Sequence, residues 1–417
     1  MRRRHLAVAV VAALSAIAGP VPVAGRAAAT TPDAWGQAAA HATGDRYNPG
    51  ESRLTPAAAA KLRPGWNVPL TTAKCAAPAA SLVGAGRLVT AASYRISGHD
   101  ASTGALVWRT PATSRKTSIT LAAIVGPRLV VQSRDCRSGK TSLAAHDVRT
   151  GKILYTRQIP ETLYGVLVDK GIVVGSVWDA TVSRYGIRAY RVADGTRVWA
   201  RQGSSIAGET IAAGGRILVV GDDRTTAVDV TTGTAVWPAG AGCFTPIGAS
   251  PDGARFYLRC GPDERIRTVS AATGAVLRTF PGHGGTFGFA TDGERVYLHT
   301  YSNELIAVDA TDGRRLWTAA FTGNAPVTLS VGGGVLYGWR GHGHPLAALD
   351  ARTGSSIALP ASTSDLRDAP MVANGRLYGT TRSAVTTYAP GPACLATSDV
   401  GCIGMPALGA VWSSASL

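Results

Sequence analysis

Short runs of β-branched and aromatic residues, each preceded by a glycine turn, recur along most of the chain. Eight of these turns are centred on Gly86, Gly126, Gly171, Gly215, Gly253, Gly293, Gly334 and Gly375. A glycine turn followed by such a run is typical of a β-hairpin, in which the run forms the second strand. The pattern therefore predicts eight similar hairpins in an all-β protein.

A second motif follows most of these hairpins in one fixed register. It is centred on a glycine that returns at steps of 47, 44, 38, 41, 39 and 41 residues, at Gly104, Gly151, Gly195, Gly233, Gly274, Gly313 and Gly354. Four residues before the glycine stand the acids Asp100, Asp147, Asp229, Asp309 and Asp350, and four residues after it the aromatics Trp108, Tyr155, Trp199, Trp237 and Trp317. The carboxylate can accept hydrogen bonds from nearby backbone N–H groups while the glycine takes a positive φ. The motif thus predicts a tight turn between antiparallel strands, with the aromatic ring facing a neighbouring sheet.

Together the two patterns give four short strands per repeat at a period of about 40 residues, which is typical of a β-propeller blade. The eighth hairpin, after Pro370, has no complete glycine-centred turn behind it, so its blade lacks an outermost strand. Residues Leu62 to Leu70 contain an isolated Trp66 before the first hairpin and can supply that strand. We predict eight four-stranded antiparallel blades closed by an N-terminal strand, with seven blades as the alternative.

The pattern Ala-x-Asp-x-x-Thr-Gly-x-x-x-Trp resembles the tryptophan-docking motif of the quinoprotein (PQQ-like) β-propeller repeat superfamily over about residues 62–392. The entry segment is similar to the leader of that superfamily through Arg46, Tyr47, Asn48, Pro49, Leu62 and Trp66. The resemblance implies one of two functional kinds: quinone-dependent dehydrogenases, or cofactor-free scaffolds such as the propeller lipoprotein of the outer-membrane barrel-assembly machine. Both kinds carry the docking motif, which implies blade stabilisation and not cofactor binding.

A quinone dehydrogenase needs calcium, held by carboxylate and amide oxygens, and an apolar clamp for the cofactor. The resemblance implies that this clamp often includes a disulfide between adjacent cysteines, and none of the six cysteines here is adjacent to another. The sequence also contains no G-x-S-x-G, H-E-x-x-H or phosphate-loop motif. The His99-Asp100 and His146-Asp147 pairs fall inside the repeat and are expected to be structural. We therefore expect no catalytic residue, no metal and no cofactor, with PQQ and calcium as the alternative.

The chain carries a formal net charge of +16, from 42 Lys and Arg against 26 Asp and Glu. Such a surface attracts anionic polymers, although the preference for arginine over lysine is also what a GC-rich genome would produce. Basic residues are not interleaved with aromatic residues as single-strand binders require. The charge therefore favours an anionic cell-wall polymer or an extracellular protein as partner, and no specific nucleic acid.

Residues 1–29 resemble a secretory signal peptide, with Arg2 to Arg4 before an apolar run that is too short for a membrane span. The expected organisation is an irregular segment over 30–61, the propeller over 62–392 and a tail over 393–417. The mature protein is expected to be a monomer, secreted or associated with the cell wall.

Six cysteines in an exported chain suggest disulfides, although the sequence does not give their connectivity. Cys243 and Cys260 flank the first hairpin of the fifth blade, and Cys394 and Cys402 would close a loop in the tail. By elimination Cys75 would pair with Cys136, which ties blade one to blade two. Partial pairing with some free thiols is the alternative.

These observations favour a secreted, non-catalytic propeller that serves as a binding or scaffold module for an extracellular protein or anionic cell-wall polymer. The alternative is a PQQ-dependent dehydrogenase that oxidises alcohols or sugars. A small-molecule lyase or hydrolase at the central channel is a third possibility.

Overall fold

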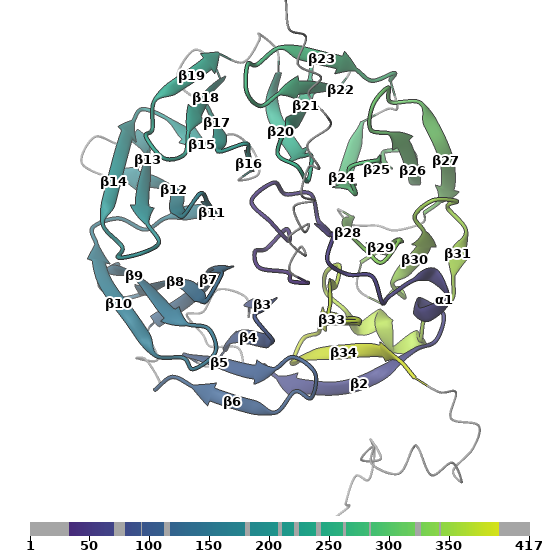
Figure 1. Cartoon of the computed structure of the whole chain (residues 1–417), viewed down its shortest axis with the longest axis horizontal. Coiled ribbons are helices and arrows are strands. Elements are labelled where there is room, and N and C mark those ends of the chain that lie inside the picture. Colours follow the sequence, from purple (N-terminus) through teal and green to yellow (C-terminus); the bar gives the residue numbers. More distant parts are fainter. Residues whose placement is uncertain are drawn as a thin grey trace, which may run out of the picture. The chain divides into compact units, whose positions relative to one another are not determined.

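The repeated turns bring the strands together as eight antiparallel sheets set around a ring (Figure 1), which confirms the eight-bladed prediction. The computed structural model describes residues 33–70, 80–92, 94–111, 117–179, 184–206, 211–220, 225–238, 243–261, 264–282, 285–321, 327–341 and 343–391. The predicted signal peptide, the tail from residue 393 and Cys75, Cys394 and Cys402 lie outside the described residues.

Strands in the first three blades follow one another in chain order across each sheet, and in the fourth blade the first two strands both pair with the third. Blade one contains β3 (Ala80–Gly84), β4 (Arg87–Ala92), β5 (Arg95–Asp100) and β6 (Leu106–Arg109). Blade two contains β7 (Thr117–Val125), β8 (Arg128–Asp135), β9 (Thr141–Asp147) and β10 (Ile153–Ile159). Blade three contains β11 (Tyr164–Asp169), β12 (Ile172–Asp179), β13 (Arg184–Arg191) and β14 (Arg197–Gln202). Blade four contains β15 (Ser205–Ile206), β16 (Ala212–Ala213), β17 (Arg216–Val220), β18 (Thr225–Asp229) and β19 (Ala235–Pro238).

The last four blades repeat this order, with strands from the N-terminal region added to two of them. Blade five contains β20 (Cys243–Ala249), β21 (Arg255–Cys260), β22 (Arg265–Ser270) and β23 (Val276–Thr279). Blade six contains β24 (Thr286–Thr291), β25 (Arg295–Thr300), β26 (Glu304–Asp309) and β27 (Arg315–Ala320). Blade seven contains β28 (Thr328–Gly332), β29 (Val335–Trp339), β30 (Ala347–Asp350), β31 (Ser356–Ile357) and β1 (Tyr47–Asn48). Blade eight contains β32 (Met371–Ala373), β33 (Arg376–Thr380), β34 (Ala384–Pro390) and β2 (Leu62–Pro69).

The ring closes where strand β2, from the N-terminal side, pairs antiparallel with β34 near the other end of the described chain. Leu62 pairs with Pro390 and Pro69 with Ala384, so β2 is the outermost strand of blade eight, as predicted. Its Trp66 contacts Tyr378 of the same blade at 6.0 Å between ring centroids and donates a hydrogen bond to the carbonyl of Ser102 in blade one. The closing strand therefore joins blade eight to blade one through the residue singled out from the sequence.

The segment before β2 was expected to be irregular, but it contains two short elements, β1 and α1 (Pro56–Ala59). The short 3-10 helix η1 (Ala361–Asp365) precedes blade eight. Thr55 caps α1 because its side chain accepts a hydrogen bond from the Ala58 N–H, and Pro56 occupies the first helical turn, where its missing N–H costs nothing.

Residues 35–48, which we call the inner segment, run around the centre of the ring (dark purple in Figure 1). They form hydrogen bonds with the innermost strand of each of the eight blades in chain order. The pairs are Trp35 with Val83, Gly36 with Ile124, Gln37 with Val168, Ala42 with Ala212, Thr43 with Ala249, Asp45 with Thr291, Arg46 with Val331 and Asn48 with Val372. Six of these pairs join two backbones, whereas Gln37 and Asn48 use side-chain amides. The inner segment thereby links all eight blades to one another at the centre.

The hydrophobic core is divided into clusters that lie mainly between neighbouring blades, because each sheet buries both faces against the next sheet. One cluster joins Tyr257 and Phe280 of blade five to Val296 and Leu298 of blade six. Strand alternation places these side chains on the faces that meet. No helix within the described ranges is long and apolar enough to span a membrane.

Candidate functional site

The aromatic residues of the repeat lie on the glycine turns of the next blade. Trp66 covers Gly104, Trp108 covers Gly151, Tyr155 covers Gly195, Trp199 covers Gly233, Trp237 covers Gly274 and Trp317 covers Gly354. The indole N–H groups complete the contact by donating to carbonyls of the same turns, those of Ser102, Val148, Val230, Ala271 and Ala351, at 2.8–3.1 Å. These aromatic side chains therefore serve to join neighbouring blades.

Glycine is required in these turns for two reasons. The seven glycines have φ between 72° and 75°, a left-handed conformation that other L residues rarely adopt. A Cβ atom at Gly233 would also lie 2.6 Å from the indole of Trp199, well inside van der Waals contact. Only the residue without a side chain permits both the turn and the docked ring.

Aspartates of the repeat are acceptors for the backbone of the same turns. Asp100 accepts hydrogen bonds from the N–H groups of Ser102 and Thr103 at 2.9 and 3.0 Å. The Ser102 hydroxyl and these backbone groups lower the pKa of Asp100 to about 2, because they stabilise the ionised carboxylate. Asp147, Asp229, Asp309 and Asp350 accept from the following backbone in the same way.

One docking residue departs from the register read from the sequence. The position that corresponds to tryptophan in blade five is Arg278, and Phe280, two residues later, lies on Gly313 instead. Side chains two apart on a strand share a face, so Phe280 can replace the missing ring. An aromatic residue two positions after the expected one is the signal in the sequence that could have identified Phe280.

His99 and His146 are also engaged within the repeat. Each is buried, and each places Nδ1 near a turn carbonyl, that of Gly104 at 3.1 Å and that of Gly151 at 3.2 Å. Burial lowers the pKa of both imidazoles below the ordinary value of 6.5, because it penalises the charged form.

The stability of the ring is expected to fall as the pH is lowered from 7.5 to 5. The unfolded chain binds protons at His146 near pH 6.5, before the folded state does, so acidification favours unfolding. Urea-denaturation midpoints across this range measure the effect. The variant His146→Gln should lose less stability over this range than the native chain. The matched control replaces the exposed His344 by glutamine and should lose as much as the native chain. Equal losses in all three proteins would show that His146 does not cause the pH dependence.

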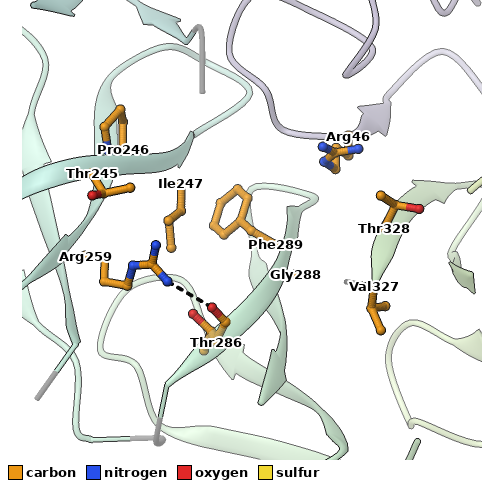
Figure 2. A pocket seen from close by; sticks show the side chains of 10 residues that line it. All are labelled: Arg46, Thr245, Pro246, Ile247, Arg259, Thr286, Gly288, Phe289, Val327 and Thr328. Carbon is orange, nitrogen blue, oxygen red and sulfur yellow. Dashed lines mark hydrogen bonds between the residues drawn. The ribbon is translucent and has the colours of Figure 1, made fainter. Parts of the chain in front are cut away.

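A separate pocket lies inside the ring, where the inner segment faces the innermost strands of blades five, six and seven. It has a volume of about 190 Å³, and we call it the inner pocket (Figure 2). Its ten lining residues are Arg46, Thr245, Pro246, Ile247, Arg259, Thr286, Gly288, Phe289, Val327 and Thr328. Figure 2 shows the Phe289 ring between Arg46 and Arg259. No pattern in the sequence indicated this site, because Arg46 and Arg259 lie far apart along the chain.

The walls of the inner pocket are held by contacts outside it. The Phe289 ring packs against Tyr257 at 5.3 Å between centroids, and it lies so close to Gly248 that a side chain there would overlap it. The Arg259 guanidinium donates to the Thr286 carbonyl at 3.2 Å, drawn as a dashed line in Figure 2, and lies 3.8 Å from Glu264. These contacts fix the shape of the pocket without a ligand.

The lining residues do not fit the calcium ion of a quinone-dependent enzyme. Calcium binds to carboxylate, amide and carbonyl oxygens, whereas the charged side chains that line the inner pocket are the cations of Arg46 and Arg259. Guanidinium groups repel a metal cation and attract carboxylates or phosphates. The inner pocket therefore does not fit PQQ with its calcium ion.

Comparison with known proteins places the chain among propellers of one family. Residues 9–201 and 262–357, more than half of the chain, match the family described as outer membrane protein assembly factor BamB. No curated protein sequence matches the chain.

Solved structures with the same fold include both kinds of propeller expected from the sequence. BamB from Moraxella catarrhalis is 19% identical, with a TM-score of 0.53, over 79% of this chain and 97% of that chain. Quinohemoprotein alcohol dehydrogenase ADHIIG from Pseudomonas putida HK5 is 14% identical, with a TM-score of 0.60, over 86% of this chain and 80% of that chain. At these identities the likeness concerns the fold alone. The family match, together with the eight docked blades, shows that the chain belongs to the BamB family of PQQ-like repeat β-propellers.

Proposed function

We propose that the protein is a secreted, non-catalytic binding module that holds an anionic cell-wall polymer on a rigid ring. The aspartates, glycines and indoles of the repeat form turns and contacts between blades, so they support a structural role for the repeat. The outer surface and the inner pocket are then the parts that can bind a partner. Membership in the BamB family is consistent with a binding or scaffold role.

The observation that carries the proposal is the positive charge on the outermost strands. Exposed arginines recur at Arg109 on β6, Arg157 on β10, Arg197 on β14, Arg278 on β23 and Arg315 on β27. They lie on the outer strands of blades one, two, three, five and six and belong to a chain with a formal net charge of +16. Exposed cations on several blades attract a polyanion from solution and hold it at several points.

Retention of the full chain on beads that carry poly(glycerol phosphate) tests this function. We expect binding at 50 mM NaCl, loss of most binding at 500 mM because salt screens exposed charges, and no binding to neutral dextran beads. Replacing Arg109, Arg157 and Arg278 by glutamine should weaken retention several-fold. The matched control replaces the exposed neutral residues Thr156, Gln158 and Thr318 by alanine and should leave retention unchanged.

Two results would contradict the proposal. Equal retention of the arginine variant and the native chain, or capture of an extracellular protein without any polymer binding, would exclude the polymer as partner. Stoichiometric uptake of PQQ in the presence of calcium, with dye-linked oxidation of an alcohol or sugar, would exclude a non-catalytic module.

We also propose that Cys243 and Cys260 form a disulfide in the secreted protein. They stand directly opposite each other on β20 and β21, and such residues have Cα atoms about 4.5–5.5 Å apart, within the range of a disulfide. Cys260 is buried, and the described residues contain no free cysteine. The partner of Cys136 remains a prediction, since Cys75 lies outside the described residues.

Peptide mapping of the alkylated, unreduced protein is expected to show Cys243 and Cys260 in one linked peptide pair. Replacing both by serine should lower the free energy of unfolding by about 3 kcal/mol, as expected for a loop of this length. Recovery of both cysteines in alkylated form would show that the bridge is absent.

A further inference from the structure

Three aromatic side chains stand on one side of blade three, near the end where β12 leads to β13. Trp178 of β12 is paired with Tyr185 of β13, and Tyr164 of β11 is paired with Ser176, two residues before Trp178. Paired residues on neighbouring strands, and residues two apart on one strand, point to the same side of a sheet. The rings of Tyr164, Trp178 and Tyr185 therefore share one surface, which we call the aromatic platform.

The aromatic platform is exposed, unlike the rings that dock between blades. Tyr164, Trp178 and Tyr185 are 49%, 46% and 55% exposed, whereas the docked Trp108 and Trp199 are 8% and 9% exposed. Apolar ring surface that stays in contact with water adds little to the stability of the fold. A group of such side chains on a folded protein is typical of an interaction site.

The geometry of the aromatic platform favours a single ring with polar groups at its rim. Trp178 and Tyr185 meet edge to face, with centroids 4.9 Å apart and planes at 72°. Successive nucleic acid bases stack on several ring faces, whereas a nearly perpendicular pair forms a corner with one open face and a border. A pyranose fits this corner, because its apolar C–H face packs on an aromatic face and its hydroxyl rim can bond the Tyr185 hydroxyl.

Exposed cations near this end of blade three select the kind of sugar. They are Arg184 at the start of β13 and, around the turn between β8 and β9 of blade two, Arg134, Arg137 and Lys140. That turn reaches blade three, since the Thr141 hydroxyl lies 3.0 Å from the hydroxyl of Thr162, just before β11. The cations repel a cationic ligand such as a quaternary ammonium group and attract sugars with acid groups. This attraction acts through solvent over about 8 Å in physiological salt and requires no contact with a particular cation.

We propose that the aromatic platform binds a pyranose ring of an acidic glycan. The proposal deepens the polymer-binding function proposed above and rests on it, because it names the class of polymer and places the contact on blade three. The open face of the Trp178–Tyr185 corner packs against the C–H groups of the sugar, and Tyr164 extends the surface along the same side of the sheet.

Isothermal titration of the full chain with a pentamer of galacturonic acid tests the proposal. Two probes serve as controls: maltopentaose keeps the sugar rings but lacks the acid groups, and pentaaspartate keeps the acid groups but lacks the rings. Because ring packing and charge both contribute, we expect the galacturonic acid pentamer to bind about tenfold more tightly than either control.

Substitutions in the aromatic platform test its role directly. Trp178→Ala and Tyr185→Ala should each weaken binding of the galacturonic acid pentamer about tenfold, within the range measured for aromatic rings that stack on nucleic acid bases. Trp178→Phe should keep part of the binding, because a smaller ring remains. Tyr301→Ala removes a ring that is 49% exposed on blade six and should bind as the native chain does. Thermal melts check that each variant is folded, and Tyr185→Ala decides if Trp178→Ala is not.

Three results would overturn the inference. Native affinity in the folded Trp178→Ala and Tyr185→Ala variants would show that the aromatic platform is not the site. Equal affinity for the galacturonic acid pentamer and either control would show that the protein does not select an acidic sugar. Tighter binding of a single-stranded oligonucleotide would assign the aromatic platform to nucleic acid.

Retention on poly(glycerol phosphate), which contains no sugar ring, separates this inference from the function on which it rests. Retention of the native chain without selective binding of the galacturonic acid pentamer would refute the aromatic platform as a sugar site and leave polymer binding intact. Selective binding of the pentamer that depends on Trp178, without retention on poly(glycerol phosphate), would do the reverse.

Discussion

Replacement of Trp199 by alanine is expected to lower the free energy of unfolding by about 3–5 kcal/mol. The indole is 9% exposed, lies on Gly233 of the next blade and donates to the Val230 carbonyl at 2.8 Å. Alanine leaves a cavity between two blades and also leaves that carbonyl without its donor. Guanidinium-induced unfolding followed by far-ultraviolet circular dichroism measures the change.

Blade three contains a matched control for this substitution. Trp178 is 46% exposed and contacts Tyr185 edge to face at 4.9 Å between centroids. Its replacement by alanine removes the same side chain from a surface, so we expect a loss below about 1 kcal/mol. Equal losses at Trp178 and Trp199 would show that docking between blades does not stabilise the ring.

A chain that begins at residue 71 is expected not to form a folded monomer, because it lacks both the inner segment and β2. The truncation removes the buried side chains of Trp35, Leu54, Leu62, Val68 and Leu70. Full burial of each contributes about 1.5–3 kcal/mol, so their combined loss is comparable with the whole stability of a typical domain. It also exposes the edge of β34, which can then pair with another chain. Size-exclusion chromatography and a thermal melt report the outcome.

A chain that begins at residue 32 is the control for this truncation and should fold as the full chain does. Addition of a synthetic peptide that covers residues 32–70 should restore a folded complex with the longer truncation. A stable monomer that lacks residues 32–70 and melts as the control does would show that neither the inner segment nor β2 is needed for closure.

The ring was predictable from the sequence because its repeat depends on local chemistry. Asp100 and Gly104 define a turn by their own side-chain and backbone preferences, and Trp108 follows at a fixed distance. Trp66 was identified for the same reason, as a docking residue that lacked a blade of its own. Each of these residues either stabilises a turn a few positions away in the sequence or packs on the turn of the adjacent blade.

The inner segment and the inner pocket were not predictable because they depend on contacts between distant positions. Gly36, Ala42 and Thr43 bind the ring through their backbones, which leave no pattern in the residue types. Arg46 stood out as part of the leader, but Arg259, which lines the same pocket, comes from the second strand of blade five. Phe280 was missed because the aromatic position moved by two residues.

The order in which the blades are bonded at the centre has a consequence for folding. A chain that emerges N-terminus first presents Asn48 early, yet the carbonyl that its side chain binds belongs to Val372, 324 positions later. The hydrogen bonds between the inner segment and the ring cannot all form until the last blade has been synthesised. Since contacts between such distant positions are slow to form, the final step of folding should be slow, and during it the unpaired inner strands stay open to other chains.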